Sequence, residues 1–336
     1  LINILNHILR PLEWVVAQLL TLFHHALVTF GMTAGPSPAW GITIMCLVLV
    51  IRICLLPLFL SQMRAMQRIQ VLQPQIQRIQ HKYAARKDPR SKEAMQREIM
   101  ALQQRYNANP LGSCLPSLIQ APILCSLFYT LQSLPAIADG NAEPLGGIDH
   151  TMAGDIESSS IFGVRIADSF GTVASPQSRI IIGVAVALMC LTLFAIQWML
   201  IHRNTSKDAM VSPQFRVQKM TVFVFPAIYV VSGATLPFGV LLYWLTNNLW
   251  NLGQTLCQLR WFPTPGSAAG ERKARRDYEQ DNRRRAAAGL PSLEEERAMA
   301  AREEAKARRE REKSAASRNR KQHKTPHLAK RSIVKR

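Results

Sequence analysis

Hydrophobic positions along the chain fall into long apolar runs separated by strongly polar segments. The first run, residues 39–60, contains one charged residue, Arg52. About 20 residues rising about 1.5 Å each cross a hydrocarbon core about 30 Å thick, so this run predicts a first transmembrane span. Later runs at 115–138, 180–201, 221–235 and 236–259 predict four more spans within the segment 113–259. The pattern therefore predicts an all-α polytopic membrane protein with five transmembrane helices.

Helical periodicity also appears outside these runs. In the N-terminal segment 1–38, polar residues at 18, 21, 25 and 29 lie largely opposite apolar residues at 16, 20, 23 and 27. This predicts an interfacial amphipathic helix over 8–32, with a sixth span as the alternative. Segment 61–112 has two apolar stripes separated by Asp88-Pro89, which predict an antiparallel helical hairpin. Pro74 predicts a kink in its first helix or the start of that helix.

The last two spans are joined by only a few residues, so we expect them to form a tight helical hairpin. The run 221–235 covers about 22 Å at about 1.5 Å per residue. It is shorter than a hydrocarbon core, which predicts local thinning of the bilayer or hydrated helix ends.

Charge orients the predicted spans. The chain has 41 Lys and Arg against 22 Asp and Glu. Segment 61–112 holds ten basic and three acidic residues, segment 202–219 four and one, and loop 137–176 one and six. By the positive-inside rule the two basic segments are cytoplasmic and the acidic loop is extracytoplasmic. This predicts a multi-pass plasma-membrane protein with an extracytoplasmic N-terminal helix and a cytoplasmic C-terminus.

The tail, residues 260–336, contains 23 basic and 11 acidic residues. It has too little apolar surface for a core, so we expect it to be largely disordered, with a helix-forming stretch over 294–313. Its charge predicts binding to RNA or to the headgroups of anionic lipids.

Catalytic machinery is not evident. The sequence has no phosphate-binding glycine loop, no HExxH, no nucleophile elbow and no carboxylate pair within a span. Its six cysteines lie in or beside apolar runs, where they are expected to be small buried hydrophobes. We therefore predict no enzymatic activity, no cofactor and no metal, and a proton-coupled transporter is disfavoured.

Arg52 is the main candidate for function, because a charge within a span costs about 2.5–3.5 kcal/mol on insertion scales. The alternative is that its side chain extends to a nearby interface. Polar groups in other predicted spans are Gln120, Gln197, Tyr243, Trp244 and Asn247. Each amide alone could join two helices, but together with Arg52 they predict a hydrated cavity.

Three blocks of sequence resemble the YidC family of membrane protein insertases: IRICLLPLFLSQMRAMQRIQVLQPQIQRIQHKY, YNANPLGSCLPSLIQAPILCSLF and VQKMTVFVFPAIYVVSGATLPFGVLLYWLTNNLWNLGQ. They cover roughly 40–259. The chain most resembles the Gram-positive members, and its basic tail resembles actinobacterial ones. The resemblance implies five spans around a positively charged groove open to cytoplasm and lipid, with a mobile cytoplasmic hairpin and a ribosome-contacting tail.

The resemblance also implies roles for single residues. Arg52 would be the groove arginine, with Gln120, Gln197 and Trp244 at groove positions and Tyr243 beside them. Trp198 and Met199 fall where the family touches its substrate. Val48 departs from members that carry a hydroxyl there.

The implied function is insertion of membrane proteins. The implied partners are nascent membrane proteins and the ribosome, and the Sec translocon and anionic lipids are further candidates. Two alternatives stay open. A small-solute transporter predicts an inverted repeat. A ribosome-tethering scaffold predicts a sealed bundle in which Arg52 is inaccessible.

Overall fold

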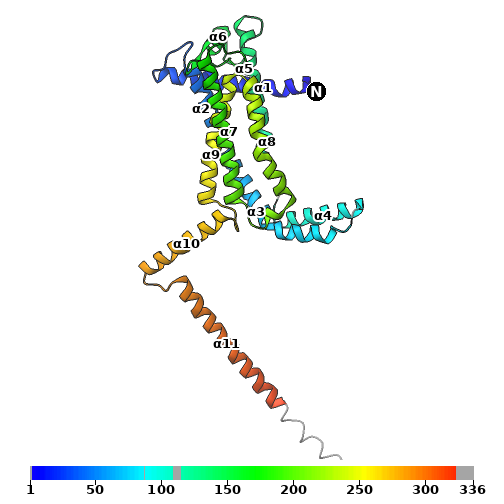
Figure 1. Cartoon of the computed structure of the whole chain (residues 1–336). Coiled ribbons are helices and arrows are strands. Elements are labelled where there is room, and N and C mark those ends of the chain that lie inside the picture. Colours follow the sequence, from blue (N-terminus) through cyan, green and yellow to red (C-terminus); the bar gives the residue numbers. More distant parts are fainter. Residues whose placement is uncertain (1, 87, 109–114, 323–336) are drawn as a thin grey trace, which may run out of the picture. The chain divides into compact units, whose positions relative to one another are not determined.

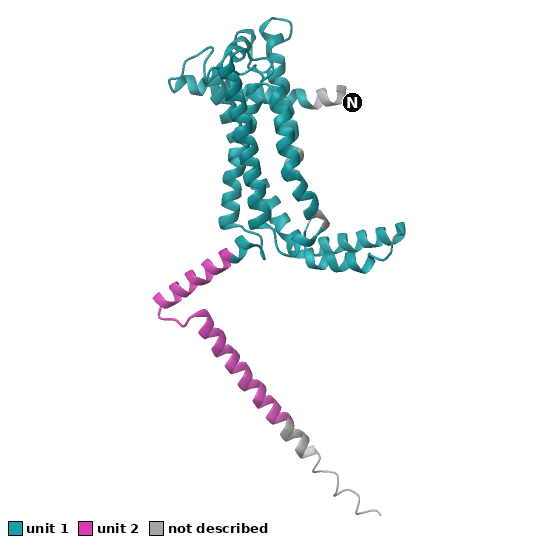
Figure 2. Ribbon diagram, in the orientation of Figure 1, with its two compact units in different colours: residues 1–271 teal, residues 272–336 magenta. Residues whose placement is uncertain are grey.

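The computed structural model describes residues 2–86, 88–108 and 115–322, and these are largely helical. The chain divides into two compact units, residues 1–271 and 272–336 (Figure 2). The predicted boundary at 112/113 and the last residues of the basic tail lie outside the described residues.

Five helices of the first unit pack side by side (Figure 1). They are α2 (Ala39–Cys54), α5 (Leu115–Ala138), α7 (Pro176–Asn204), α8 (Pro213–Thr235) and α9 (Phe238–Trp261). Among the described residues, four helices are long and apolar enough to span a membrane, namely α1, α5, α7 and α8, and α2 with α3 forms a fifth, bent candidate. The predicted class, an all-α polytopic membrane protein, is confirmed.

The first predicted span is broken. Helix α2 ends at Cys54, and α3 (Leu56–Tyr83) continues after a bend of 54°. Pro57, in the first turn of α3, has no N–H to donate to the carbonyl group one turn earlier, so the helix cannot pass straight through Leu55. The predicted first span over 39–60 therefore consists of two helices joined at a bend, and together they remain a candidate span.

The fourth span is longer than the sequence suggested. Helix α8 has 23 residues, about 34 Å, and it begins where the Ser212 hydroxyl accepts a hydrogen bond from the Phe215 N–H. Hydropathy falls before residue 221, but the helix continues through these polar residues. The helix is therefore longer than the apolar run 221–235, and local thinning of the bilayer or hydrated helix ends stay predictions.

Helix α1 (Ile2–Thr29) lies across one end of the bundle (Figure 1) and packs on α2 and α5. Its residues Val16, Ala17 and Leu20 enter the main hydrophobic core, where they join Trp40 and Tyr243. One side of the helix is therefore covered by protein, whereas its apolar residues Trp14 and Leu22 stay exposed.

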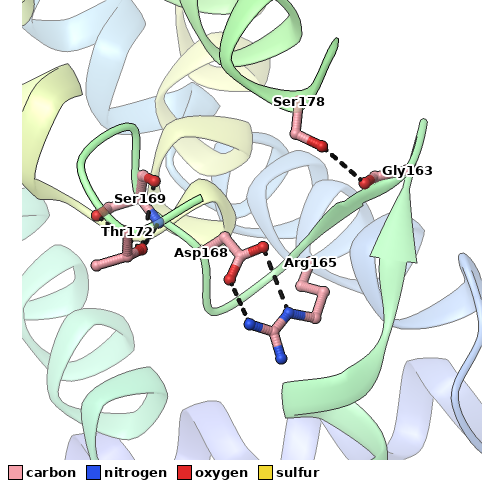
Figure 3. A network of polar contacts seen from close by, with 6 residues as sticks. All are labelled: Gly163, Arg165, Asp168, Ser169, Thr172 and Ser178. Atoms are coloured by element: carbon pink, nitrogen blue, oxygen red, sulfur yellow. Dashed lines mark hydrogen bonds and ion pairs between the residues drawn. The ribbon is translucent and has the colours of Figure 1, made fainter. Parts of the chain in front are cut away.

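The loops at the same end are held by short-range polar contacts (Figure 3). They include α6 (His150–Ser158) and two antiparallel strands, β1 (Ser160–Ile161) and β2 (Val164–Arg165). Arg165 pairs with Asp168 at 2.8 Å. The carbonyl groups of Ile166 and Asp168 accept hydrogen bonds from the N–H groups of Gly239 and Phe238, which satisfies free donors in the first turn of α9.

Helix α3 forms a hairpin with α4 (Pro89–Arg105). Their seam contains Ile69, Leu72 and Ile76 of α3 with Ile99 and Leu102 of α4. The Lys82 ammonium contacts Glu98 at 2.9 Å and lowers the pKa of that carboxyl group. Helix α3 runs through Pro74, so Pro74 does not mark its start.

The tail contains two helices, α10 (Ala268–Ala287) and α11 (Leu293–Gln322), where the sequence predicted a largely disordered segment. Ion pairs one turn apart, Lys273 with Asp277 and Arg308 with Glu312, support helix without a hydrophobic core. A segment with too few apolar residues for a hydrophobic core can therefore still form helices.

Candidate functional site

Helix α9 positions most of the candidate site. Its first turns are buried against α2 and α7, with Phe238 2% and Leu241 0% exposed. Below this apolar anchor the helix carries Tyr243, Trp244 and Asn247. Because the anchor fixes the rotation of α9 about its axis, it also fixes the direction of these side chains.

Arg52 and Asn247 form the central contact. The Arg52 Nε donates a hydrogen bond to Asn247 Oδ1 at 2.8 Å, and a terminal guanidinium nitrogen donates to the same oxygen. Arg52 is half-buried, and none of the ion pairs among the described residues involves it. The amide therefore orients the guanidinium group and leaves its charge uncompensated.

A second contact lies one turn away on α9. The Gln120 Nε2 donates a hydrogen bond to the Tyr243 hydroxyl, and Tyr243 is 2% exposed. The Gln120 Oε1 is buried, and no described residue provides a hydrogen-bond partner for it. Since Tyr243 and Asn247 are four residues apart, they share one face of α9, and three helices contribute polar groups to one region.

Tyr229 of α8 also belongs to this region, although sequence reasoning missed it. Its ring stacks on Trp244 with centroids 5.0 Å apart, and its hydroxyl donates to Asn248 Oδ1 at 3.5 Å. Asn248 Nδ2 is buried and has no partner among the described residues. The available signal was a single tyrosine within the apolar run of α8.

The candidates on α7 lie apart from this cluster. Trp198 is 52% exposed and stacks on His202 with centroids 3.8 Å apart, whereas Gln197 and Met199 are half-buried. Within the described part of the chain, none of the three makes a hydrogen bond or ring contact with Arg52, Gln120 or Asn247. The structure thus pairs Arg52 with Asn247 and Gln120 with Tyr243 by hydrogen bonds, and it stacks Trp244 on Tyr229.

Val48 is 1% exposed on α2, in the main core. Val48, which stands where some members of the family carry a hydroxyl group, is therefore a buried apolar residue. It leaves the Arg52 contact to Asn247 unaffected in the structure.

The fold and site define a class: a helical membrane protein that holds a cationic side chain within a bundle of apolar helices. Residues 32–264 match the family described as 60Kd inner membrane protein. The chain belongs to this family of bacterial inner-membrane proteins, which is not a family of enzymes.

Curated relatives agree. The chain is 44% identical over 301 residues to a protein named membrane protein insertase YidC from Bifidobacterium longum, covering 89% of each chain. It is 34% identical to the Streptomyces avermitilis protein of the same name, covering 80% of this chain and 61% of that one. Identity to the Tropheryma whipplei protein of that name is 31%, covering 82% and 91%.

Proposed function

We propose that this chain inserts membrane proteins by giving the hydrophilic segment of a nascent protein a polar route past Arg52. The observation that carries this proposal is the Arg52–Asn247 contact, in which an amide orients the guanidinium group without neutralising it. An acidic segment arriving from the cytoplasm is attracted to the free charge, and low local dielectric strengthens that attraction.

The route lowers a solvation barrier, and no covalent step is needed. Moving a polar group into hydrocarbon without a hydrogen bond costs several kcal/mol. The polar side chains of Arg52, Gln120 and Asn247 can make hydrogen bonds that replace those the substrate made to water. The substrate's apolar helix then leaves sideways between α7 and α9. The driving force is the burial of its apolar surface, which is favourable by about 25 cal/mol per Å².

The packing supports an exit in the half of the α7–α9 interface that lies beyond the core shared by the two helices. Their shared core contains Ile182, Ala185 and Met189 of α7 with Leu241 and Leu242 of α9, at the end that faces the acidic loop. Trp198 and Met199 lie beyond this core, and we propose that they contact the departing helix.

The proposed orientation places α1 and loop 137–176 outside the cell, and the α3–α4 hairpin and the C-terminus in the cytoplasm. The charge distribution supports it. The position of α1 across the end of the bundle supports an interfacial helix rather than a sixth span (Figure 1).

The test compares Arg52→Ala and Arg52→Lys in an insertion assay with an acidic leader on a single-span substrate. Loss of insertion by Arg52→Ala and retention by Arg52→Lys are expected if charge attraction acts. Arg64→Ala, an exposed position on α3, is the matched control. Full insertion by Arg52→Ala would contradict the proposal.

We further propose that the tail binds the ribosome and holds it at the membrane, because α10 and α11 are largely exposed and residues 260–336 hold 23 basic against 11 acidic residues. Thr264 and Ser267 are buried in the first unit, so truncation should follow Glu271 rather than Phe262. Truncation is expected to remove salt-sensitive ribosome binding. Unchanged ribosome binding with lost binding to anionic vesicles would assign the tail to lipid.

The scaffold alternative and the insertase proposal differ in the solvent access that they predict for the site. A scaffold predicts that a cysteine at position 52 or 120, in a background without native cysteines, resists a water-soluble thiol reagent. The insertase proposal predicts labelling from the cytoplasmic side. A working partnership with the Sec translocon stays a prediction from the family resemblance.

A further inference from the structure

A polar cavity lies away from Arg52, between α3, the end of α7, α8, α9 and the linker that follows α9. Its volume is about 200 Å³. The polar side chains that line it are all uncharged, although the chain has a net charge of +19. We call this the amide pocket, after its amide residues Gln62, Gln67, Gln70, Asn204, Gln218 and Gln258.

Several of these amides bind backbone groups of the chain itself. Gln67 Nε2 donates to the Phe262 carbonyl oxygen at 2.5 Å, and Gln70 Oε1 accepts from the Ser206 N–H at 3.4 Å. Asn204 Oδ1 accepts from the Thr264 N–H at 2.9 Å. Each bond uses one of the two polar groups of an amide, so the walls are fixed while the other group can face a ligand.

The chemistry of the pocket fits a peptide backbone. Neutral amides supply donors and acceptors together, and a backbone presents N–H and C=O groups in alternation. A phosphate or a carboxylate would find no cation among the described residues that line the cavity. An apolar cavity of about 450 Å³ adjoins the pocket and shares Phe59, Met63 and Gln258 with it, which leaves room for side chains.

The pocket also lies in line with the candidate site. Gln62 follows Arg52 by ten residues, and Gln258 follows Asn247 by eleven. At about 1.5 Å per residue, α9 carries Gln258 about 16 Å from Asn247, whereas Arg52 and Gln62 lie on either side of the bend at Leu55. Since an extended chain advances about 3.3 Å per residue, about five residues bridge this distance.

From this geometry we propose that the amide pocket binds the extended backbone of the substrate's hydrophilic segment, whatever its sequence, about five residues from the part that lies at Arg52. The proposal rests on the proposed insertase function and adds a second contact for the same substrate. Arg52 selects charge, whereas the amide pocket holds any polypeptide that can offer backbone hydrogen bonds.

The first test maps register with the full-length protein in membrane vesicles. A photoreactive residue replaces Met66, which lines the pocket, or Asn247 in a separate sample. The probe is a stalled nascent chain with an apolar span and an uncharged Ser/Gly leader. Crosslinked leader positions are expected to differ by about five residues between the two samples. Crosslinks without a fixed offset would overturn the proposal.

The second test removes the amides. The double variant Gln218→Leu and Gln258→Leu loses two hydrogen-bonding groups and none of the three backbone bonds above. Crosslinking from position 66 to the uncharged leader is expected to fall about tenfold. Gln75→Leu, an exposed position on α3 outside both cavities, is the matched control and should crosslink as the parent does.

The outcomes separate the two proposals. If the double variant crosslinks as the parent does, the pocket holds water only and this inference fails. The insertase proposal still stands in that case, provided that Arg52→Ala loses insertion of an acidic leader. If Arg52→Ala inserts normally while the double variant loses its crosslinks, the amide pocket is retained and the role of Arg52 is wrong.

Discussion

Helices α8 and α9 are neighbours in sequence but differ in which side chains they expose and bury. Helix α8 exposes much of its apolar surface, including Phe223 at 74% and Val231 at 69%. Helix α9 buries its first turns, and its polar residues Tyr243 and Asn248 are each 2% exposed. Of these two described helices, α8 is apolar enough to be a candidate span and α9 is not.

The contrast shows how a membrane changes the usual rule for burial. A helix that faces lipid must be apolar on its outside, because hydrocarbon offers no hydrogen bonds. A helix surrounded by other helices can carry amides, since neighbouring side chains satisfy them. The helix with the weaker hydropathy is therefore the one that holds the site.

The largest expected effect comes from one substitution made on both helices. Phe238→Ala on α9 is expected to cost about 3–5 kcal/mol, because Phe238 is 2% exposed and its loss leaves a cavity. Phe223→Ala on α8 should change stability by about 0.5 kcal/mol or less. Thermal unfolding in detergent measures both. Equal losses would mean that α8 is covered in the folded protein.

The next prediction compares a glycine of α8 that is closely packed with a glycine of α9 that is not. A Cβ at Gly233 of α8 would lie 2.4 Å from Val186 Cγ2 of α7, so Gly233→Ala is expected to destabilise by about 2 kcal/mol. Gly253 of α9 has nothing within 4 Å, and Gly253→Ala should stabilise slightly, by about 0.5–1 kcal/mol. Loss of stability at both positions would show that α9 is also tightly packed at Gly253.

A third prediction concerns a negative charge introduced on α9 in place of an amide. Asn247→Asp places a carboxylate on Arg52 and should reduce insertion of an acidic leader about tenfold, with a smaller effect on an uncharged leader. Asn247→Leu removes the amide without adding charge and should retain most of the insertion. If both variants fail alike, the Asn247 contact acts by positioning Arg52 rather than by leaving its charge free.

Much of this contrast could be predicted from the sequence. The apolar runs located the helices, and a lone arginine within a run identified Arg52, because both signals come from a solvation cost that each residue carries by itself. Amides at helical spacing identified Gln120 and Asn247 for the same reason. Their pairing with Arg52 and Tyr243 required the rotation of α9, which is set by packing.

The differences between prediction and structure have physical causes too. The break at Leu55 depends on a missing donor at Pro57, and hydropathy does not register it. Helix α8 extends into a polar turn because Ser212 caps it there, so apolar length underestimated helix length. The amide pocket went unnoticed because its glutamines come from separate elements, and those on α3 had been assigned to a cytoplasmic hairpin alone.

The smallest effect concerns two tyrosines near the site, Tyr243 on α9 and Tyr229 on α8. Tyr243→Phe removes the hydroxyl that accepts from Gln120, and it is expected to cost about 1 kcal/mol, since the half-buried amide loses its partner. Tyr229→Phe on α8 should cost only a few tenths of that, because its bond to Asn248 is long, at 3.5 Å, and its stacking on Trp244 persists. Chemical or thermal unfolding of the two variants in one detergent gives the comparison. A larger loss for Tyr229→Phe would place the dominant polar contact of this region on α8, and the division between a lipid-facing helix and a site-bearing helix would no longer hold.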